Sequence, residues 1–222
     1  MATLTSSPLR ATATANFDAL APVYRWMEWL SFGPCLGKCR NAFLESLRGA
    51  KSALVLGDGD GRFSARLLRD VPEVRVQAVD LSAAMLRSLV TRAGKNAGRV
   101  HTWNGDAREW RAGGARYDVI ATHFFLDCLT TSEIVELASQ LRLAAGPGTR
   151  WVVSEFAVPP SLLGRWIARP LIAFLYWAFF WLTGLEVRAL PDYAVALQSA
   201  GFSLEQRRRF LGGLLVAEMW RL

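Results

Sequence analysis

The segment ALVLGDGDGRFSARLL, residues 53–68, restricts the fold of this chain more than any other. An apolar run ends at three glycines in alternate positions, Gly57, Gly59 and Gly61, and residues with helical periodicity follow. Glycine allows a tight turn and the close approach of a ligand to the backbone. The first N–H groups of the next helix are free to donate to such a ligand. The segment predicts a strand, a ligand-binding turn and a helix, with a plain glycine-rich turn as the alternative.

Strand-like and helix-like runs alternate after Ser52. The expected strands are 53–56, 74–79, 99–103, 117–122 and 150–156, and the expected helices between them are 62–69, 83–93 and 132–144. This alternation favours βαβ units and a parallel sheet that is covered on both faces. A short helix in PDYAVALQSAGF precedes two closing strands, 202–210 and 214–222, whose short connection near Gly212 predicts antiparallel pairing.

The chain shows no internal repeat and no linker, so we expect residues 1–222 to form a single domain. Residues 1–16 predict a frayed tail that lacks the apolar core of a secretory signal. Residues 17–49 predict an N-terminal helical extension, and 159–189 predict a helical insertion before the final hairpin. Its most apolar part, 171–185, is shorter than the roughly 20 residues that span a bilayer, which indicates a buried or interfacial helix.

The net charge of +7 favours anionic partners, although a solvated basic face would explain it equally. The three arginines of 207–209 lie on a predicted strand and cannot all face one way. Since no aromatic residues interleave with them, we expect no nucleic-acid partner. The cysteines, Cys35, Cys39 and Cys128, fit neither a disulfide framework nor a zinc site. Unpaired thiols favour a reducing cytoplasm, and we expect no metal.

The spacing of the glycines argues against a dinucleotide. The fingerprint GxGxxG would place its third small residue at Arg62, and a pyrophosphate would also meet Asp58 and Asp60. The turn therefore fits a ligand without phosphates, and a positively charged ligand would suit the two aspartates. A nicotinamide- or flavin-dependent oxidoreductase remains the competing class of enzyme.

Two further aspartates follow the next predicted strands. Asp80 ends the second strand, where its carboxylate could accept both hydroxyls of a ribose. The alternative is a helix cap, a role that Ser82 could also fill. Asp106 ends the third strand and could accept from an adenine amino group.

The turn and these aspartates together resemble the class I S-adenosylmethionine-dependent methyltransferases over about residues 52–156. The resemblance implies the α/β, Rossmann-like fold of that class: a seven-stranded, mostly parallel sheet with an antiparallel last strand and helices on both faces. It implies S-adenosylmethionine as the cofactor, with the glycine loop at its methionine part. The implied cofactor site consists of Gly57, Asp58, Gly59, Gly61, Asp80, Leu81, Asp106, Ala107 and Thr122.

One position departs from this family. The family usually has an acidic residue two positions before the first glycine, whereas this chain has Val55. We expect Asp58 or Asp60 to replace it at the ammonium group of the cofactor. Because of this departure, the chain could instead be a catalytically silent, lipid-binding relative of these methyltransferases.

The N-terminal stretch FDALAPVYRWMEWLSFGPCLGKCRNAFL is similar to the start of the ubiquinone and menaquinone biosynthesis C-methyltransferases. That similarity implies a small apolar acceptor that is aromatic, quinone-like or lipid-like. Tyr24 could close over the cofactor or pack in the core. Trp177 and Phe180 could roof the acceptor pocket, but the segment that holds them would equally suit peripheral membrane contact, a homodimer or a core helix.

The stretch YDVIATHFFLDCL resembles the fourth motif of the family, whose strand end lies beside the transferred methyl. Alignment of the reacting atoms supplies most of the catalysis in such a displacement. If the acceptor must lose a proton, His123 is the candidate base, and Asp127 could orient it if the stretch is helical. A histidine packed in the core is the alternative.

Overall fold

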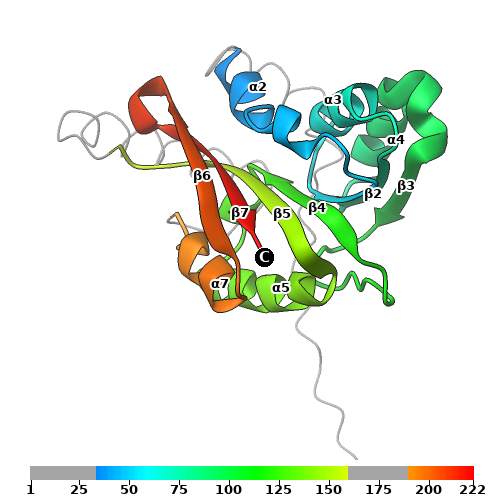
Figure 1. The fold of residues 1–222 in the computed structure, drawn as a ribbon. Helices are drawn as coiled ribbons and strands as arrows, with labels where there is room; N and C mark the ends of the chain where they lie inside the picture. Colours follow the sequence, from blue (N-terminus) through cyan, green and yellow to red (C-terminus); the bar gives the residue numbers. More distant parts are fainter. Residues whose placement is uncertain (1–33, 160–189) are drawn as a thin grey trace, which may run out of the picture.

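The computed structural model describes residues 34–159 and 190–222, which form a sheet with helices on both faces (Figure 1). The expected tail, the first half of the helical extension and all but the first residue of the predicted insertion lie outside these ranges, as do Tyr24, Trp177 and Phe180. No helix of the described residues is long and apolar enough to cross a membrane.

The sheet has seven strands in the order β3-β2-β1-β4-β5-β7-β6. Their bounds are β1 Ser52–Leu56, β2 Arg75–Asp80, β3 Val100–Asn104, β4 Tyr117–His123, β5 Ala145–Phe156, β6 Ser203–Phe210 and β7 Leu215–Arg221. Strands β1 to β5 are parallel, and β7 is antiparallel to both β5 and β6. The expected topology, with its antiparallel last strand, is confirmed.

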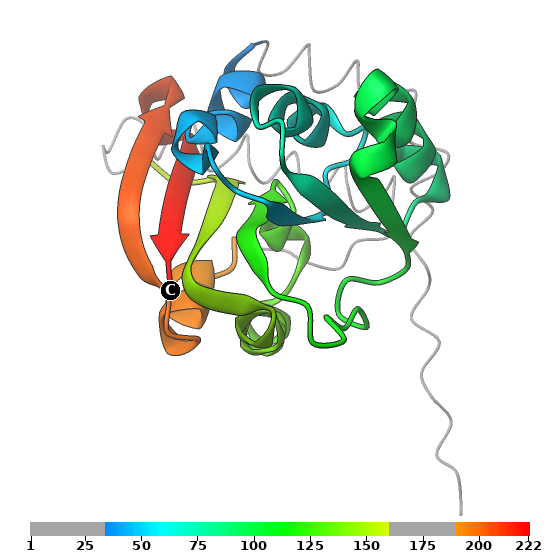
Figure 2. The ribbon, with the colours of Figure 1, turned by 45° about the vertical axis from the view of Figure 1, so that its right-hand side comes forward.

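Helices cover the two faces of the sheet in separate groups (Figure 2). One face carries α2 Cys35–Arg40, α3 Arg62–Asp70 and α4 Ala83–Ala93, and the other carries α5 Thr131–Leu143 and α7 Tyr193–Ser199. The central strand β1 is buried on both faces, which explains why its sequence is continuously apolar. Its residues alternate between the two cores: Val55 packs on the α2–α4 side, and Leu54 and Leu56 pack on the α5 side.

Two elements differ from the expectations. Strand β5 begins at Ala145, five residues before the predicted start at Arg150, because Ala145 pairs with Tyr117 across a bulge. Thr149 closes that irregular turn: its Oγ1 donates to the Tyr117 carbonyl and accepts from the Gly146 N–H. The expected helical extension over 17–49 is interrupted in its described part, because Asn41 Nδ2 donates to the Gly37 carbonyl and ends α2, and a 3-10 turn, η1 Leu44–Leu47, follows.

Candidate functional site

The glycine turn connects β1 to α3 and has three residues with left-handed backbone. The φ angles of Gly57, Gly59 and Gly61 are 64°, 58° and 79°. A Cβ on Gly57 would lie 2.4 Å from Phe125 Cδ2, and one on Gly61 would lie 2.5 Å from Leu89 Cα. A Cβ on Gly59 would meet no described atom within 4 Å. Packing therefore requires the outer two glycines, whereas the middle one faces space that a ligand can use.

Asp58 holds this turn in place from within. Its carboxylate is buried and accepts from the backbone N–H groups of Phe63, at 3.3 Å, and Ser64, at 2.8 Å. It thus caps the first turn of α3, where the N-cap residue itself, Gly61, has no side chain. Burial raises the pKa of Asp58 above its usual range, although these hydrogen bonds oppose the shift.

Asp60 also has protein partners. Its Oδ2 lies 3.1 Å from Arg62 Nε and 2.7 Å from Arg92 Nη2, and its carbonyl accepts from Arg92 Nε at 2.9 Å. Both aspartates of the turn therefore stabilise the loop. Val55, two positions before the first glycine, is buried in the core.

Asp80 lies at the end of β2, beside the glycine turn. Its Oδ1 accepts from the Ser82 N–H at 2.9 Å, while Ser82 Oγ accepts from the Met85 N–H and caps α4. Ser82 thus fills the capping role that was the alternative for Asp80. Asn104 Nδ2 donates to the carbonyls of Asp80 and Leu81, which fixes the ends of β2 and β3 relative to each other. The Leu81 side chain is half exposed.

Asp106 follows β3 and is held by an arginine. Arg108 donates to it through Nε and the backbone N–H, each at 2.9 Å, and also pairs with Glu133 on α5. Burial alone would raise the pKa of Asp106, but the hydrogen bonds from Arg108 prevail and lower it. Asp106 is therefore ionised at neutral pH. Its neighbour Ala107 is buried in the core on the α5 side.

Thr122, the sixth residue of β4, points into the core. Its Oγ1 accepts from Trp151 Nε1 at 3.0 Å, and the residue is fully buried. The side chain therefore stabilises the pairing of β4 with β5.

His123 ends β4 as a buried, neutral side chain. Its Nδ1 is hydrogen-bonded to Ser154 Oγ at 2.9 Å, and its ring packs edge-on against Phe63, with centroids 4.3 Å apart. Burial, with a smaller contribution from the charge of Arg40, lowers its pKa from 6.5 to about 3. These surroundings fit the alternative to a candidate base, a histidine packed in the core. Its Nε2 is buried without a hydrogen-bond partner in the described part of the chain.

The helical stretch under which Asp127 could orient His123 is absent from the described structure. Phe124 has a φ of 54°, and only a 3-10 turn, η3 Leu126–Cys128, follows, so the condition of a helical stretch is not met. Burial raises the pKa of Asp127 to about 6. Its Oδ1 accepts from Cys128 Sγ at 3.5 Å.

Glu155 is a buried carboxyl that the sequence reasoning missed. Its Oε1 accepts from the N–H groups of Phe125 and Leu126, at 3.1 and 2.8 Å, and thereby fixes the loop after β4. Its Oε2 is buried with no partner among the described residues. Burial, reinforced by the charge of Asp127, raises its pKa well above the usual range. The signal was a glutamate inside the apolar strand run WVVSEF.

The predicted residues thus gather at one edge of the sheet. The glycine turn, Asp80 and Asp106 follow β1, β2 and β3, which are neighbours in the order β3-β2-β1, and open α/β sheets bind ligands at this edge. His123, Asp127 and Glu155 lie at or beyond the ends of β4 and β5 on the same edge. Within 34–159 and 190–222, no three metal-ligating side chains cluster.

Residues 53–148 match the family model described as "Methyltransferase domain". No curated protein sequence matches the chain. The mitomycin 7-O-methyltransferase MmcR has a similar structure, with 19% identity and a TM-score of 0.69; the match covers 95% of this chain and 61% of that one.

Two other solved structures are similar. An O-methyltransferase family protein from Burkholderia thailandensis is 16% identical, with a TM-score of 0.66, and the match covers 92% of this chain and 57% of that one. The N-methyltransferase NodS from Bradyrhizobium japonicum WM9, in complex with S-adenosyl-L-homocysteine, is 14% identical, with a TM-score of 0.60 and coverages of 86% and 87%.

The chain spans only 61% and 57% of the first two structures, and these identities establish the fold alone. The matches do not favour an oxidoreductase. Residues 53–148 match the model of a methyltransferase domain, the described sheet has the class I methyltransferase fold, and these similarities imply S-adenosylmethionine as the cofactor.

Proposed function

We propose that this protein transfers a methyl group from S-adenosylmethionine to a small apolar acceptor. The observation that carries the proposal is Gly59, whose left-handed backbone faces open space beyond the carboxyl end of β1, the strand that pairs with β2 and its last residue, Asp80. A ligand can lie against such a backbone only where no Cβ intervenes.

The described residues fit the nucleoside side of the cofactor. Asp80 would accept from the ribose hydroxyls, with Leu81 beside it. Asp106, already ionised and held by Arg108, would orient the loop that meets the adenine together with Ala107. The cofactor would supply a methyl group on a positively charged sulfur, and the chain would align the acceptor with it.

For the methionine part of the cofactor, the roles that we propose for Asp58 and Asp60 differ from our expectation. Because the carboxylates of Asp58 and Asp60 bind α3 and two arginines, we propose that they shape the glycine loop and that Gly57 and Gly59 present backbone groups to the cofactor. Thr122 would support this edge from inside the core.

The two catalytic candidates are not equivalent. A histidine with a pKa of about 3 is a weak base at neutral pH. The pKa of about 6 at Asp127 lies much nearer the working range. We propose Asp127 as the group that takes up a proton if the acceptor atom carries one, and His123 as a residue that packs β4 against α3.

The nature of the acceptor rests on the sequence. The residues 171–185 are almost entirely apolar, and Trp177 and Phe180 lie within them. We propose that they and Tyr24 contact an aromatic, quinone-like or lipid-like acceptor, as in the ubiquinone and menaquinone biosynthesis group that the N-terminal stretch resembles. A homodimer and a cytoplasmic, membrane-peripheral location remain part of this proposal.

Calorimetry tests the cofactor directly. We expect saturable binding of S-adenosylmethionine and S-adenosylhomocysteine and no binding of NAD. Transfer of a labelled methyl group to quinone-like acceptors then separates an enzyme from a catalytically silent relative. Binding of NAD in place of S-adenosylmethionine would contradict the proposal.

A further inference from the structure

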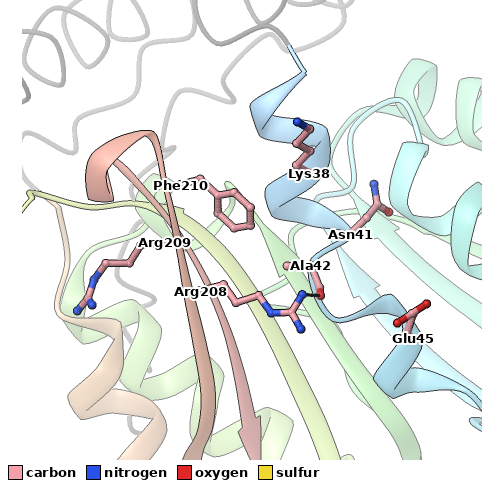
Figure 3. A pocket seen from close by; sticks show the side chains of 7 residues that line it. All are labelled: Lys38, Asn41, Ala42, Glu45, Arg208, Arg209 and Phe210. Atoms are coloured by element: carbon pink, nitrogen blue, oxygen red, sulfur yellow. Dashed lines mark hydrogen bonds between the residues drawn. The ribbon is translucent and has the colours of Figure 1, made fainter.

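A groove lies beside β6, the edge strand at the opposite end of the strand order from β3, and this strand is strongly basic. The groove has a volume of about 720 Å³ and lies between α2 with η1 on one side and the edge strand β6 on the other (Figure 3). Lys38, Asn41 and Glu45 line it from the helical side, and Arg208, Arg209 and Phe210 line it from β6. None of these residues belongs to the proposed cofactor site.

Arg208 is fixed inside the groove. Its Nη1 donates to the Ala42 carbonyl at 2.8 Å, and its guanidinium lies over the Phe43 ring, 5.1 Å from the centroid. These contacts hold β6 against the connection between α2 and η1, while the residue as a whole stays exposed. The strand therefore presents a positive charge that is already ordered.

Two further cations are not neutralised. Lys38 and Arg209 are exposed, and neither makes an ion pair within the described part of the chain. The acidic residue of the groove, Glu45, lies 3.9 Å from Arg48. Figure 3 shows Arg208 and Phe210 on the α2 side of β6 and Arg209 on its other side, so positive charge surrounds the end of the strand.

The hairpin tip next to these cations is apolar. Leu211, the residue after β6, is 47% exposed, and Phe210 and Leu214 are partly buried. The Ala157 N–H donates to the Leu214 carbonyl, which places the end of β5 beside this tip, and Val158 there is 41% exposed. Leu211 also has a left-handed backbone, with a φ of 49°, which is uncommon for a residue other than glycine.

We propose that this tip docks on an anionic phospholipid bilayer, with Leu211 and Val158 entering the interface and Lys38, Arg208 and Arg209 meeting the lipid phosphates. Apolar residues backed by a ring of cations are the arrangement that binds anionic membranes. The exposed leucine beyond the cations favours a bilayer over a soluble phosphate. Because the base-stacking platform of single-strand binders is missing among the groove residues, a nucleic acid is disfavoured.

Vesicle co-sedimentation of the full chain tests the charges. We expect binding to vesicles of phosphatidylserine and phosphatidylcholine that weakens with rising salt, and little binding to phosphatidylcholine alone. Each basic residue near such a surface contributes about fivefold to the partition coefficient. The double variant Lys38→Ala/Arg209→Ala should therefore bind roughly 25-fold more weakly. The control Arg87→Ala/Lys95→Ala makes the same charge change on α4 and η2 Gly94–Arg99, and should bind like the parent.

Leu211→Asn tests the apolar tip, since asparagine tolerates a left-handed backbone and removes the apolar side chain. We expect weaker vesicle binding with unchanged thermal stability. Leu143→Asn, at another exposed leucine on α5, is its control and should bind normally.

Four results would overturn the docking proposal. The first three are no binding of the parent to anionic vesicles, equal losses in the test and control variants, and full competition by inorganic phosphate or duplex DNA at matched ionic strength. Binding that survives Lys38→Ala/Arg209→Ala would point to the segment 171–185 and would also overturn it. The affinity of these variants for S-adenosylmethionine should not change. A failure of the membrane-docking proposal can therefore be distinguished from a failure of the proposed methyltransferase function.

Discussion

His123 Nδ1 and Ser154 Oγ are 2.9 Å apart, and this hydrogen bond joins the ends of β4 and β5 inside the protein. Ser154 Oγ is also 3.3 Å from the Cys39 carbonyl, to which it donates. The pair thus connects two strands to α2 and places the imidazole against Phe63. Burial at this position favours the neutral form of the His123 ring and opposes its protonation.

The first prediction is that His123 stays neutral in the folded protein. Nuclear magnetic resonance of the two histidines should show one ring that does not titrate between pH 8 and about pH 4, because its pKa is lowered to about 3. His101→Gln assigns the signals by removing the other one. A ring at His123 that titrates near 6.5 would restore it as a general base.

The same shift predicts how His123 affects stability. Its folded pKa lies below the unfolded value of 6.5, so the unfolded state binds more protons between pH 6.5 and about pH 3. The free energy of unfolding should fall as the pH decreases through that range. His123→Gln should lose less stability than the parent on acidification, as measured by denaturant titration.

A third prediction concerns Asp127, where the sign is opposite. Its folded pKa of about 6 lies above the usual 3.8, so the folded state retains a proton that the unfolded state has lost. Its contribution to the free energy of unfolding should fall by roughly 3 kcal/mol between pH 4 and pH 7. Asp127→Asn removes this term, so the variant should gain stability relative to the parent as the pH rises. A constant difference across this range would show that Asp127 is ionised in the fold.

The strand ends were predictable because their chemistry is local. The alternation of strand-like and helix-like runs predicted the parallel sheet, and the three glycines predicted the turn after β1. The lowered pKa of His123 was not predictable, since it depends on burial against residues that are far away in sequence, such as Phe63, and on the charge of Arg40. The roles of Asp58 as a helix cap and of Glu155 as an anchor for the loop after β4 likewise arise from tertiary contacts.

A fourth prediction concerns Asp80. Asp80→Asn keeps an oxygen for the Ser82 N–H but removes the charge that would bind the ribose. Losing a charge-assisted hydrogen bond costs about 1.5–3 kcal/mol, so the dissociation constant for S-adenosylmethionine should rise roughly tenfold or more. Asp192→Ala, at the cap of α7, should lower stability and leave that constant unchanged. Equal affinities of Asp80→Asn and the parent would remove Asp80 from the site.

A fifth prediction concerns the apolar segment. If Trp177 and Phe180 contact the acceptor, Trp177→Ala or Phe180→Ala should raise the KM for the acceptor and leave the affinity for S-adenosylmethionine nearly unchanged. A thermal melt must accompany the kinetics, because truncating a fully packed aromatic costs about 3–5 kcal/mol. If the variants only unfold or change their oligomeric state, the segment is structural and the apolar acceptor loses its main support.

The most direct test of the cofactor site compares two glycines. Gly59 and Gly113 have φ angles of 58° and 55°, and a Cβ at either would meet no described atom within 4 Å. Gly59 follows the carboxyl end of β1, whereas Gly113 precedes the amino end of β4, where the parallel strands begin. Gly59→Val and Gly113→Val therefore carry a similar backbone strain. Calorimetry with S-adenosylmethionine should show binding abolished in Gly59→Val and preserved in Gly113→Val; undiminished binding by a folded Gly59→Val would contradict the assignment of the glycine loop as the cofactor site.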